Sequence, residues 1–469
     1  MKNNDKPSKA QRRARRKRVL HKHMEVVNLY SAGIDIGSEK HYVAVPEGLD
    51  DDPVRCFSCF TADLQRMADW LVEIGITTVV MESTGVYWIP AFEILAERGL
   101  EVLLVNARHV KNVSGRKSDV QDCQWLQQLH TFGLLAGAFR PPEQVCALRS
   151  YTRQRETLVH SASAHIQHMQ KALRQMNLLL DNVVSDVTGK TGMDIIRAIV
   201  SGERDPDRLA AYRDPRCKQS QATIAESLRG HYRAEHLFTL RQSLAAYDFY
   251  QTQIEQCDGE IEQQLADFDS HCEAGELKPL GQTGQPRKTR SSPKGAVREQ
   301  LYRITAVDLT QIHGLDENSV LKIISETGTD MTCWRTHKHF TSWLSLSPNN
   351  TVSGGKVLKS KTKSSANRAA TAFRIAAMSI SRSDSALGAF YRRLSFRVGK
   401  AKAITATARK LAVIFYMMIK HKTEYVDQGQ AYYEQQYRER TLNYLKKKAQ
   451  TLGFDLTPID LENNELSIA

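Results

Sequence analysis

The sequence predicts an α/β N-terminal domain with a mixed sheet and flanking helices, a middle of long helices, and a mainly α C-terminal domain. Residues 29–105 hold three successive strand-like runs and then alternate helices with strands. Two later runs repeat apolar residues at heptad-like spacing, which indicates long helices. Because a chain of 469 residues is too long to fold around one ordinary hydrophobic core, we expect several domains.

The N-terminal elements follow from short apolar runs that turn residues separate. The expected strands are LYSAGIDIGS, HYVAVP, PVRCFSCF, TTVVM and EVLLV, and the expected helices are TADLQRMADWLVEIG and WIPAFEILAERG. Glu82 follows the fourth strand run, and Gly99 closes the second helix. Cys56 and Cys59 form a lone CxxC, which we interpret as strand residues rather than as a metal site.

The middle of the chain carries two apolar repeats. Their positions are Leu148, Tyr151, Leu158, Ala162, Met169 and Leu173, and then Leu240, Leu244, Tyr247, Ile254, Ile261 and Leu265. Two such helices fit a coiled coil, either antiparallel or between subunits, and they fit an ordinary helical bundle equally well. The pattern does not assign the mixed polar insertion 177–235.

Composition shifts divide the chain further. We expect a basic N-terminal arm (1–28), the α/β domain (29–140), long helices (141–273), a flexible basic linker (274–298), a C-terminal domain (299–425) and a helical tail (426–469). No run of about 18 apolar residues occurs, so no membrane span is expected. Eight scattered cysteines and no signal-peptide core predict a cytoplasmic protein.

The basic surplus predicts a polyanionic partner. The chain has 65 Lys and Arg against 52 Asp and Glu, which gives a formal net charge of +13. The surplus concentrates in the arm, in residues 286–298 and in residues 356–422. A solvated charged face is the simpler interpretation, but three separate clusters favour nucleic acid. The candidate contacts are Arg12, Arg13, Arg15, Arg16, Arg116, Lys117, Lys356, Lys359, Lys361, Lys363 and Arg368.

Four acids are predicted to meet at one edge of the sheet. Asp35 lies inside the first strand, between isoleucines that should face a core, and Glu82 ends the fourth. Asp119 and Asp122 begin a helix after the fifth strand, and residues three apart share a helical face. Sites gather at the carboxyl ends of strands in open α/β sheets. For Asp119 and Asp122 alone, the alternative is capping at a helix N-terminus.

Converging carboxylates need cations. Two negative charges that are about 4 Å apart repel each other by roughly 4 kcal/mol at an effective dielectric constant near 20. Oxygen ligands without His or Cys select Mg²⁺ or Mn²⁺. Two such ions about 3.5–4 Å apart serve displacement at phosphate. We therefore expect Asp35, Glu82, Asp119 and Asp122 to bind Mg²⁺, with Mn²⁺ as a substitute.

At this point several motifs together resemble a known family. GIDIGSEKHYVAV, ESTGVYW and KSDVQD resemble the DEDD catalytic domain of the insertion-sequence transposases that use a structured bridge RNA. That domain is similar to the Holliday-junction resolvase RuvC and has an RNase H-like fold. LSLSPNNTVSGGK resembles the C-terminal transposase domain of the same family. The resemblance covers residues 29–175 and 299–425, and the order and spacing of the motifs make it specific.

The resemblance implies a mechanism. The four acids align with the metal-binding tetrad, and Ser353 aligns with a serine nucleophile, next to Gly354 and Gly355, which would let it approach a phosphodiester. It further implies strand cleavage and exchange between donor and target DNA through a phosphoserine, guided by a structured RNA. The enzyme would be a homo-oligomer, a dimer or a tetramer built as a dimer of dimers, acting at the bacterial nucleoid.

Two positions depart from the family pattern. TQIHGLDENSVLKIISETG resembles a helix-hairpin-helix segment that usually carries Gly-Ile-Gly, but Asp316 replaces the second glycine. This weakens the case for a phosphate-binding hairpin at Gly314. KTKSSANRAA lacks a glycine often found before the asparagine.

Other functions compete with the recombinase. A metal-dependent nuclease that uses water, as RuvC-like resolvases do, explains the tetrad but leaves the second domain idle. An actin-like ATPase or sugar kinase matches GIDIGSEKHYVAV as a first phosphate loop, but its second phosphate loop and adenosine motif are missing from the sequence. A non-catalytic RNA-binding scaffold leaves the four acids unexplained. The recombinase is therefore the expected function.

Overall fold

We describe a computed structural model of the chain, in which residues 25–83, 85–106, 118–272, 277 and 291–457 are described. The chain divides into two compact units, residues 1–140 and 141–469, and each is treated by itself. The arm arginines Arg12, Arg13, Arg15 and Arg16, together with Arg116 and Lys117, lie outside the described residues. Most of the predicted linker 274–298 lies outside them as well.

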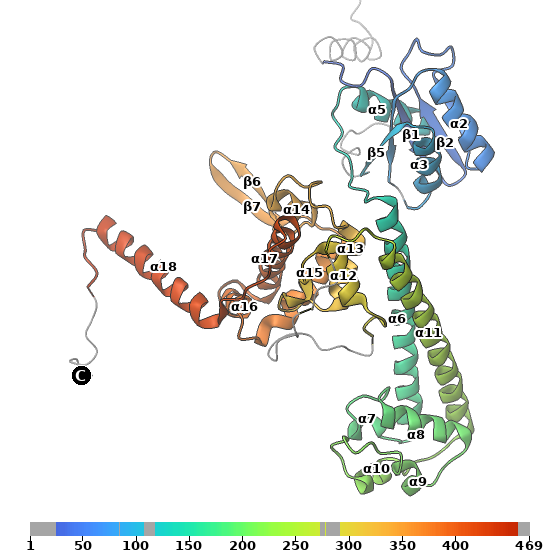
Figure 1. Cartoon of the computed structure of the whole chain (residues 1–469), viewed down its shortest axis with the longest axis vertical. Coiled ribbons are helices and arrows are strands. Elements are labelled where there is room, and N and C mark those ends of the chain that lie inside the picture. Colours follow the sequence, from blue (N-terminus) through green and yellow to red (C-terminus); the bar gives the residue numbers. More distant parts are fainter. Residues whose placement is uncertain (1–24, 84, 107–117, 273–276, 278–290, 458–469) are drawn as a thin grey trace, which may run out of the picture. The chain divides into compact units, whose positions relative to one another are not determined.

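The first unit is built on a five-stranded mixed sheet with the order β3-β2-β1-β4-β5 (Figure 1). Strands β1 (Ser31–Ile36), β2 (Lys40–Ala44) and β3 (Val54–Ser58) pair antiparallel. Strands β4 (Thr78–Glu82) and β5 (Glu101–Val105) extend the sheet in parallel from β1. The sequence predicted a mixed sheet from three strands followed by α/β alternation, and the structure adds the strand order.

Helices cover both faces of the sheet. On one face, α2 (Thr61–Glu73) and α3 (Trp88–Glu97) pack on Ile34 and Ile36, the isoleucines that flank Asp35. On the other face, α5 (Asp119–Thr131) packs on Val80 and Val105. Because side chains alternate along a strand, the residues between the buried isoleucines of β1 point toward α5.

The second unit begins with two 33-residue helices, α6 (Glu143–Gln175) and α11 (Ala234–Ala266), which pack along each other in opposite directions. We call this pair the stalk. Gln144 donates to the carbonyl of Asp267 at one end, and the amide of His231 donates to the carbonyl of Met176 at the other. Most of the predicted heptad positions are buried between the helices. Within this chain, the antiparallel pair is therefore the arrangement that forms.

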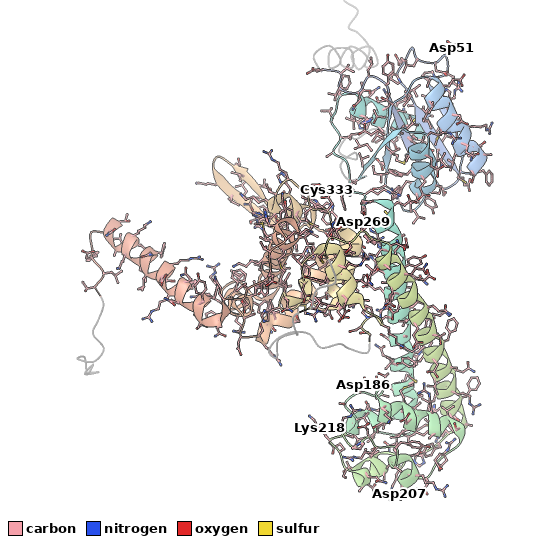
Figure 2. All side chains as sticks on the ribbon, in the orientation of Figure 1. Asp51, Asp186, Asp207, Lys218, Asp269 and Cys333 are labelled. Atoms are coloured by element: carbon pink, nitrogen blue, oxygen red, sulfur yellow. The ribbon has the colours of Figure 1, made fainter. Side chains whose placement is uncertain are left out.

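A small helical cap closes the far end of the stalk. Residues 177–233, nearly all of the insertion that the sequence pattern left unassigned, form α7 (Leu180–Val183), α8 (Lys190–Ser201), α9 (Pro206–Ala210) and α10 (Gln221–Ser227). Their core contains Ile195, Ile196 and Ile224. The labels Asp186, Asp207 and Lys218 mark this cap in Figure 2. Helices α7, α9 and α10 have at most seven residues, which is too short for a clear periodic pattern. Helix α8 has 12 residues and buries Met193, Ile196 and Ile199, a helical spacing that the sequence analysis left unused.

A buried ion pair anchors the chain where the C-terminal part begins. Arg155 of α6 donates to Asp258 of α11 at 2.5 Å, and both side chains are almost fully buried. Arg155 also donates to the carbonyl of Ser291, and Asp258 accepts from the amide of Lys294. The described end of the segment that we expected to be a flexible linker is thus held against the stalk.

The remaining chain is mainly helical, with one hairpin. Its elements are α12 (Val297–Thr305), η1 (Leu309–Gln311), α13 (Glu317–Thr327), α14 (His337–Trp343), β6 (Pro348–Ser353), β7 (Lys356–Thr362), α15 (Arg368–Ser379), η2 (Ile380–Arg382), α16 (Ala386–Val398), α17 (Lys400–His421) and α18 (Gly429–Thr451). Phe340, Phe373, Phe415 and Tyr416 form its aromatic core. This architecture confirms the predicted fold class. None of the helices in the described part of the chain is long and apolar enough to cross a bilayer.

Candidate active site

The sheet places two of the predicted acids on one face. Asp35 lies in β1 next to Gly33 on the side that α5 covers, and Glu82 ends β4 on the same side as Val80. Strands β1 and β4 are parallel and pair through Ile34 and Met81, so both acids come one residue after this pair. They therefore sit next to each other at the carboxyl edge of the sheet.

Helix α5 brings the other two acids to this edge. Asp119 and Asp122 occupy its first turn, and the N-cap position belongs to Ser118, whose side chain makes no cap bond. Neither acid is therefore the N-cap residue, although acids in a first turn still favour the helix dipole. The simple capping interpretation also does not account for the effect of both charges on Asp35.

Gly33 allows α5 to lie this close to β1. A β-carbon on Gly33 would stand 2.3 Å from the amide nitrogen of Gln127 and 2.5 Å from the carbonyl oxygen of Cys123. Both are backbone atoms of α5, so any side chain at residue 33 would push the helix away. The sequence argument did not single out this residue, although a glycine within a strand signals a close backbone approach.

The other three acids act on Asp35 electrostatically. Burial, and then the negative charges of Asp119, Asp122 and Glu82, raise the pKa of Asp35 from 3.8 to about 6. Burial and the charge of Asp35 likewise raise the pKa of the buried Cys123 thiol to about 12. An ionised Asp35 is thus costly here unless a cation balances it.

The donor set fits a hard divalent cation. All four side chains offer carboxylate oxygens, which Mg²⁺ and Mn²⁺ prefer. Burial first, and then the negative charge of the other three acids, raise the pKa of Asp35, and a bound cation would offset both. Among the residues that the structure describes, no three His, Cys, Asp or Glu side chains are arranged to hold a metal ion as they stand. Residues 107–117, which precede Ser118, lie outside those residues.

Ser353 lies at the tip of the hairpin formed by β6 and β7 in the second unit. Gly354 and Gly355 form the turn with φ angles of +54° and +76°, the left-handed pair that a tight type I′ turn requires. Every residue of β6 is exposed. The serine is therefore displayed on a narrow projection, where a large substrate can reach it.

A β-bulge aligns this serine with basic residues. Residues that lie directly opposite each other on β6 and β7 point to the same face of the hairpin. On one face these pairs are Ser353 with Lys356, Thr351 with Lys359, and Asn349 with Lys361. The register shifts at Thr351, which leaves Leu358 as the extra residue. Without this bulge, Lys356 would point away from Lys359 and Lys361. With it, three lysines and Ser353 line one face, and Lys363 follows β7 as a further exposed cation.

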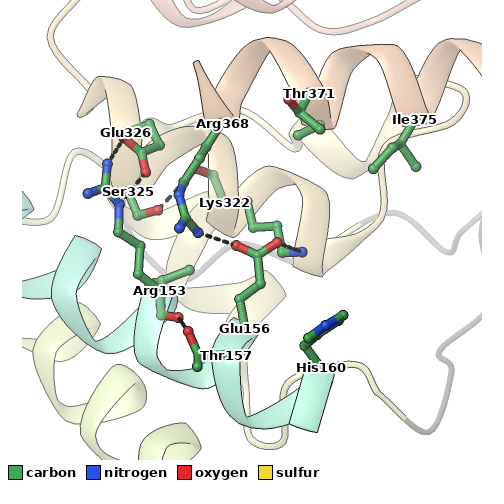
Figure 3. Close-up of a pocket in the computed structure, with 12 residues that line it drawn as sticks. Arg153, Glu156, Thr157, His160, Lys322, Ser325, Glu326, Arg368, Thr371 and Ile375 are labelled. Carbon is green, nitrogen blue, oxygen red and sulfur yellow. Dashed lines mark hydrogen bonds and ion pairs between the residues drawn. The ribbon is translucent and has the colours of Figure 1, made fainter. Parts of the chain in front are cut away.

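Arg368, the last predicted nucleic-acid contact, takes part in an ion-pair network. It donates to Glu156 of the stalk at 2.6 Å, and Lys322 of α13 donates to the same carboxylate (Figure 3). Burial acts to raise the pKa of Glu156, but Lys322 and Arg368 outweigh it and hold that pKa below its ordinary value. These groups line a cavity of about 410 Å³ between α6, α13 and α15.

The same network fixes α13 on the stalk. Arg153 binds both carboxylate oxygens of Glu326, at 2.8 and 2.9 Å. Arg149 donates to the carbonyls of Ser325 and Glu326 at the end of α13. Sequence reasoning did not find these contacts because their partners lie more than 160 residues apart. Arg368 therefore helps to hold the C-terminal helices on the stalk.

The two departures from the family pattern have local explanations. Asp316 is the N-cap of α13 and accepts from the amide of Ser319 at 2.7 Å, and Asn367 caps α15 in the same way. Gly314 has a φ of +88° and packs against the carbonyl of Ala376, which a β-carbon would meet at 2.7 Å. The residues at this segment thus serve capping and packing.

Comparison with known protein families agrees with both units. Residues 32–178 match the DEDD transposases of the IS110 type, described as "Transposase". Residues 306–392 match a second family, described as "Transposase IS116/IS110/IS902 family". No curated protein matches the chain. The two matches occur in one chain and in this order, and they make it an IS110-family transposase with a DEDD domain at its N-terminus and the second transposase domain in its C-terminal half.

Proposed function

We propose that this transposase cuts and rejoins DNA strands through a covalent phosphoserine at Ser353. The observation that carries the proposal is the hairpin face that aligns Ser353 with Lys356, Lys359 and Lys361. Phosphate groups bind lysine ammonium groups, so a DNA backbone that lies along this face brings a phosphorus atom to the serine hydroxyl. The exposed tip makes this approach possible for a duplex.

The reaction proceeds in two displacements. In the first, the Ser353 Oγ forms a bond to phosphorus while the bond from phosphorus to the leaving sugar oxygen breaks. The serine loses its proton to solvent, and the leaving oxygen takes one up. In the second, the hydroxyl of a new strand attacks the phosphoserine and releases Ser353. One phosphodiester replaces another, so no ATP is required.

The four carboxylates would bind the metal ion that the reaction requires. Asp35, Glu82, Asp119 and Asp122 would hold Mg²⁺ or Mn²⁺, which lowers the pKa of an attacking hydroxyl and stabilises a leaving oxygen. The chain's own part is to keep four oxygen donors on one edge of the sheet, which Gly33 makes possible. We expect cleavage to stop in EDTA and to return with either ion, but only poorly with Ca²⁺.

We further propose a structured RNA guide and an oligomeric enzyme. Residues 356–422 contain 16 Lys and Arg and a single acid, Asp384, which suits a folded polyanion beside the DNA. Strand exchange between two duplexes requires more than one nucleophile, so the working form contains at least two chains. Mass measurement of the purified complex, with and without ribonuclease, tests both statements.

The experiment for Ser353 uses a nicked suicide substrate that traps a covalent intermediate. Wild-type protein should give a protein–DNA adduct that survives denaturation, and Ser353→Ala should give none while it still binds DNA. Ser360→Ala is the matched control, because Ser360 lies in the same hairpin but pairs with Asn350 on the opposite face. Cleavage by Ser353→Ala at the wild-type rate would instead indicate a nuclease that uses water.

A further inference from the structure

The α16–α17 turn, by which we mean residues 396–402 at the end of α16 and the start of α17, carries the most exposed large apolar side chain that the structure describes. Phe396 is 97% exposed, and every residue from Phe396 to Lys402 is exposed. The buried face of α16 ends at Tyr391, so its last two turns lie beyond the core. This turn also lies outside both family matches, the second of which ends at residue 392.

A lone exposed phenylalanine is common on protein surfaces, so its surroundings decide what it means. Residues 385–423 contain nine Lys and Arg and neither Asp nor Glu. Arg397, Lys400 and Lys402 lie within six residues of Phe396. The aromatic ring thus lies in a segment whose Lys and Arg are balanced by no acid of that segment.

Helix α18 adds to this charge. Tyr433 and Tyr437 pack on α16, through an edge contact with Phe390 and beneath the guanidinium of Arg393. Burial, and then the positive charge of Arg440 on α18, lower the pKa of Lys410. Cations of α17 and α18 therefore stand close enough to repel one another, and an anionic ligand would relieve that repulsion.

The charge distinguishes between the possible occupants. A second copy of this chain, with a net charge of +13, would bring a like-charged surface against the turn. A duplex would satisfy the cations but would leave the phenylalanine ring in water. An unpaired strand satisfies both, because its bases offer flat faces to an aromatic ring and its phosphates offer charges to lysine and arginine.

We propose that the α16–α17 turn binds unpaired single-stranded DNA, with Phe396 stacked on a base and Arg397, Lys400 and Lys402 bound to the flanking phosphates. Strand exchange exposes such unpaired stretches, so this surface would hold a strand while it changes partners. The inference relies on DNA as the substrate of the transposase but does not depend on the chemistry of Ser353.

Fluorescence anisotropy with a 20-nucleotide oligothymidine in EDTA, without any metal, tests the surface separately from cleavage. Phe396→Ala should weaken binding about tenfold, because one lost base–aromatic stack has an effect of this order. Phe396→Trp should restore it. Phe60→Ala is the matched control, because Phe60 is 75% exposed in the first unit, outside the basic segment, and should leave the affinity unchanged.

Further measurements make the test decisive. Affinity for a blunt duplex of the same length should change less than about twofold in Phe396→Ala, and Lys400→Ala should lower the log–log salt slope by roughly 0.7, the value for one phosphate of a single strand. Unchanged oligothymidine binding in Phe396→Ala, or an equal loss for duplex, would overturn the proposal. A loss confined to oligouridine would overturn the assignment to DNA. None of these outcomes alters the adduct test at Ser353.

Discussion

Neutralising Asp35 should stabilise the metal-free protein, which is the opposite of what most buried substitutions do. The pKa of Asp35 rises from 3.8 to about 6, mainly by burial and then by the three neighbouring acids. A difference of about 2 units corresponds to ~3 kcal/mol at pH 7.5. Because Asp35 is only partly buried, solvent screening reduces the effect that we expect for Asp35→Asn to ~1–2 kcal/mol.

The sign of this effect fixes its pH dependence. The folded protein holds the Asp35 proton more tightly than the unfolded chain does, so the ionisation penalty grows as the pH rises from about 4 to about 6. It is complete above about pH 7 and absent below about pH 4. Thermal unfolding in EDTA should therefore show Asp35→Asn more stable than wild type at pH 7.5 and equally stable at pH 4.

With magnesium at pH 7.5, wild type should become more stable than Asp35→Asn. At about 100 times its dissociation constant, Mg²⁺ should stabilise wild type by ~2.7 kcal/mol and Asp35→Asn much less. Asp51→Asn is the control, because Asp51 is an exposed acid in the same unit and should change nothing (Figure 2). If Asp35→Asn were less stable than wild type in EDTA at pH 7.5, the electrostatic account of the tetrad would be wrong.

Three further predictions follow from other parts of the molecule. Gly33→Ala should displace α5, cost roughly 1–3 kcal/mol in the free energy of unfolding and abolish cleavage, and retained activity would refute the packing argument. Asp258→Ala should cost roughly 3–5 kcal/mol because Arg155 remains buried without its partner, whereas the double change Arg155→Met with Asp258→Leu should recover most of that stability in denaturant titrations. RNA binding should weaken steeply with salt, and deletion of residues 1–22 should reduce the log–log slope; salt-independent binding by the full chain would contradict an electrostatic interface.

The sequence predicted the first unit well because its signals are local. Short apolar runs marked β1 to β5, and strand alternation placed Ile34 and Ile36 in a core with Asp35 on the opposite face. Sites in open α/β sheets gather at the carboxyl ends of the strands, and this rule predicted that Asp35 and Glu82 lie together without any knowledge of contacts. Gly33 was visible within the same strand, but its role depends on the position of α5, which no local pattern gives.

The second unit was less predictable because its decisive features are not local. The heptad-like spacing predicted two long helices, but it did not distinguish antiparallel packing from intersubunit or bundle packing. A one-residue bulge aligns Lys356 with Lys359 and Lys361, and it has no signature in the sequence. Arg368 looked like a free cation, yet Glu156, 212 residues earlier, binds it.

The measurement that tests the central claim most directly is the identity of the residue that becomes linked to DNA. The adduct from the suicide substrate would be digested with protease and nuclease and sequenced by tandem mass spectrometry. Our account predicts a single nucleotide-bearing peptide with the phosphate on Ser353. A phosphate on any other residue, or strand exchange that proceeds without any adduct, would contradict it.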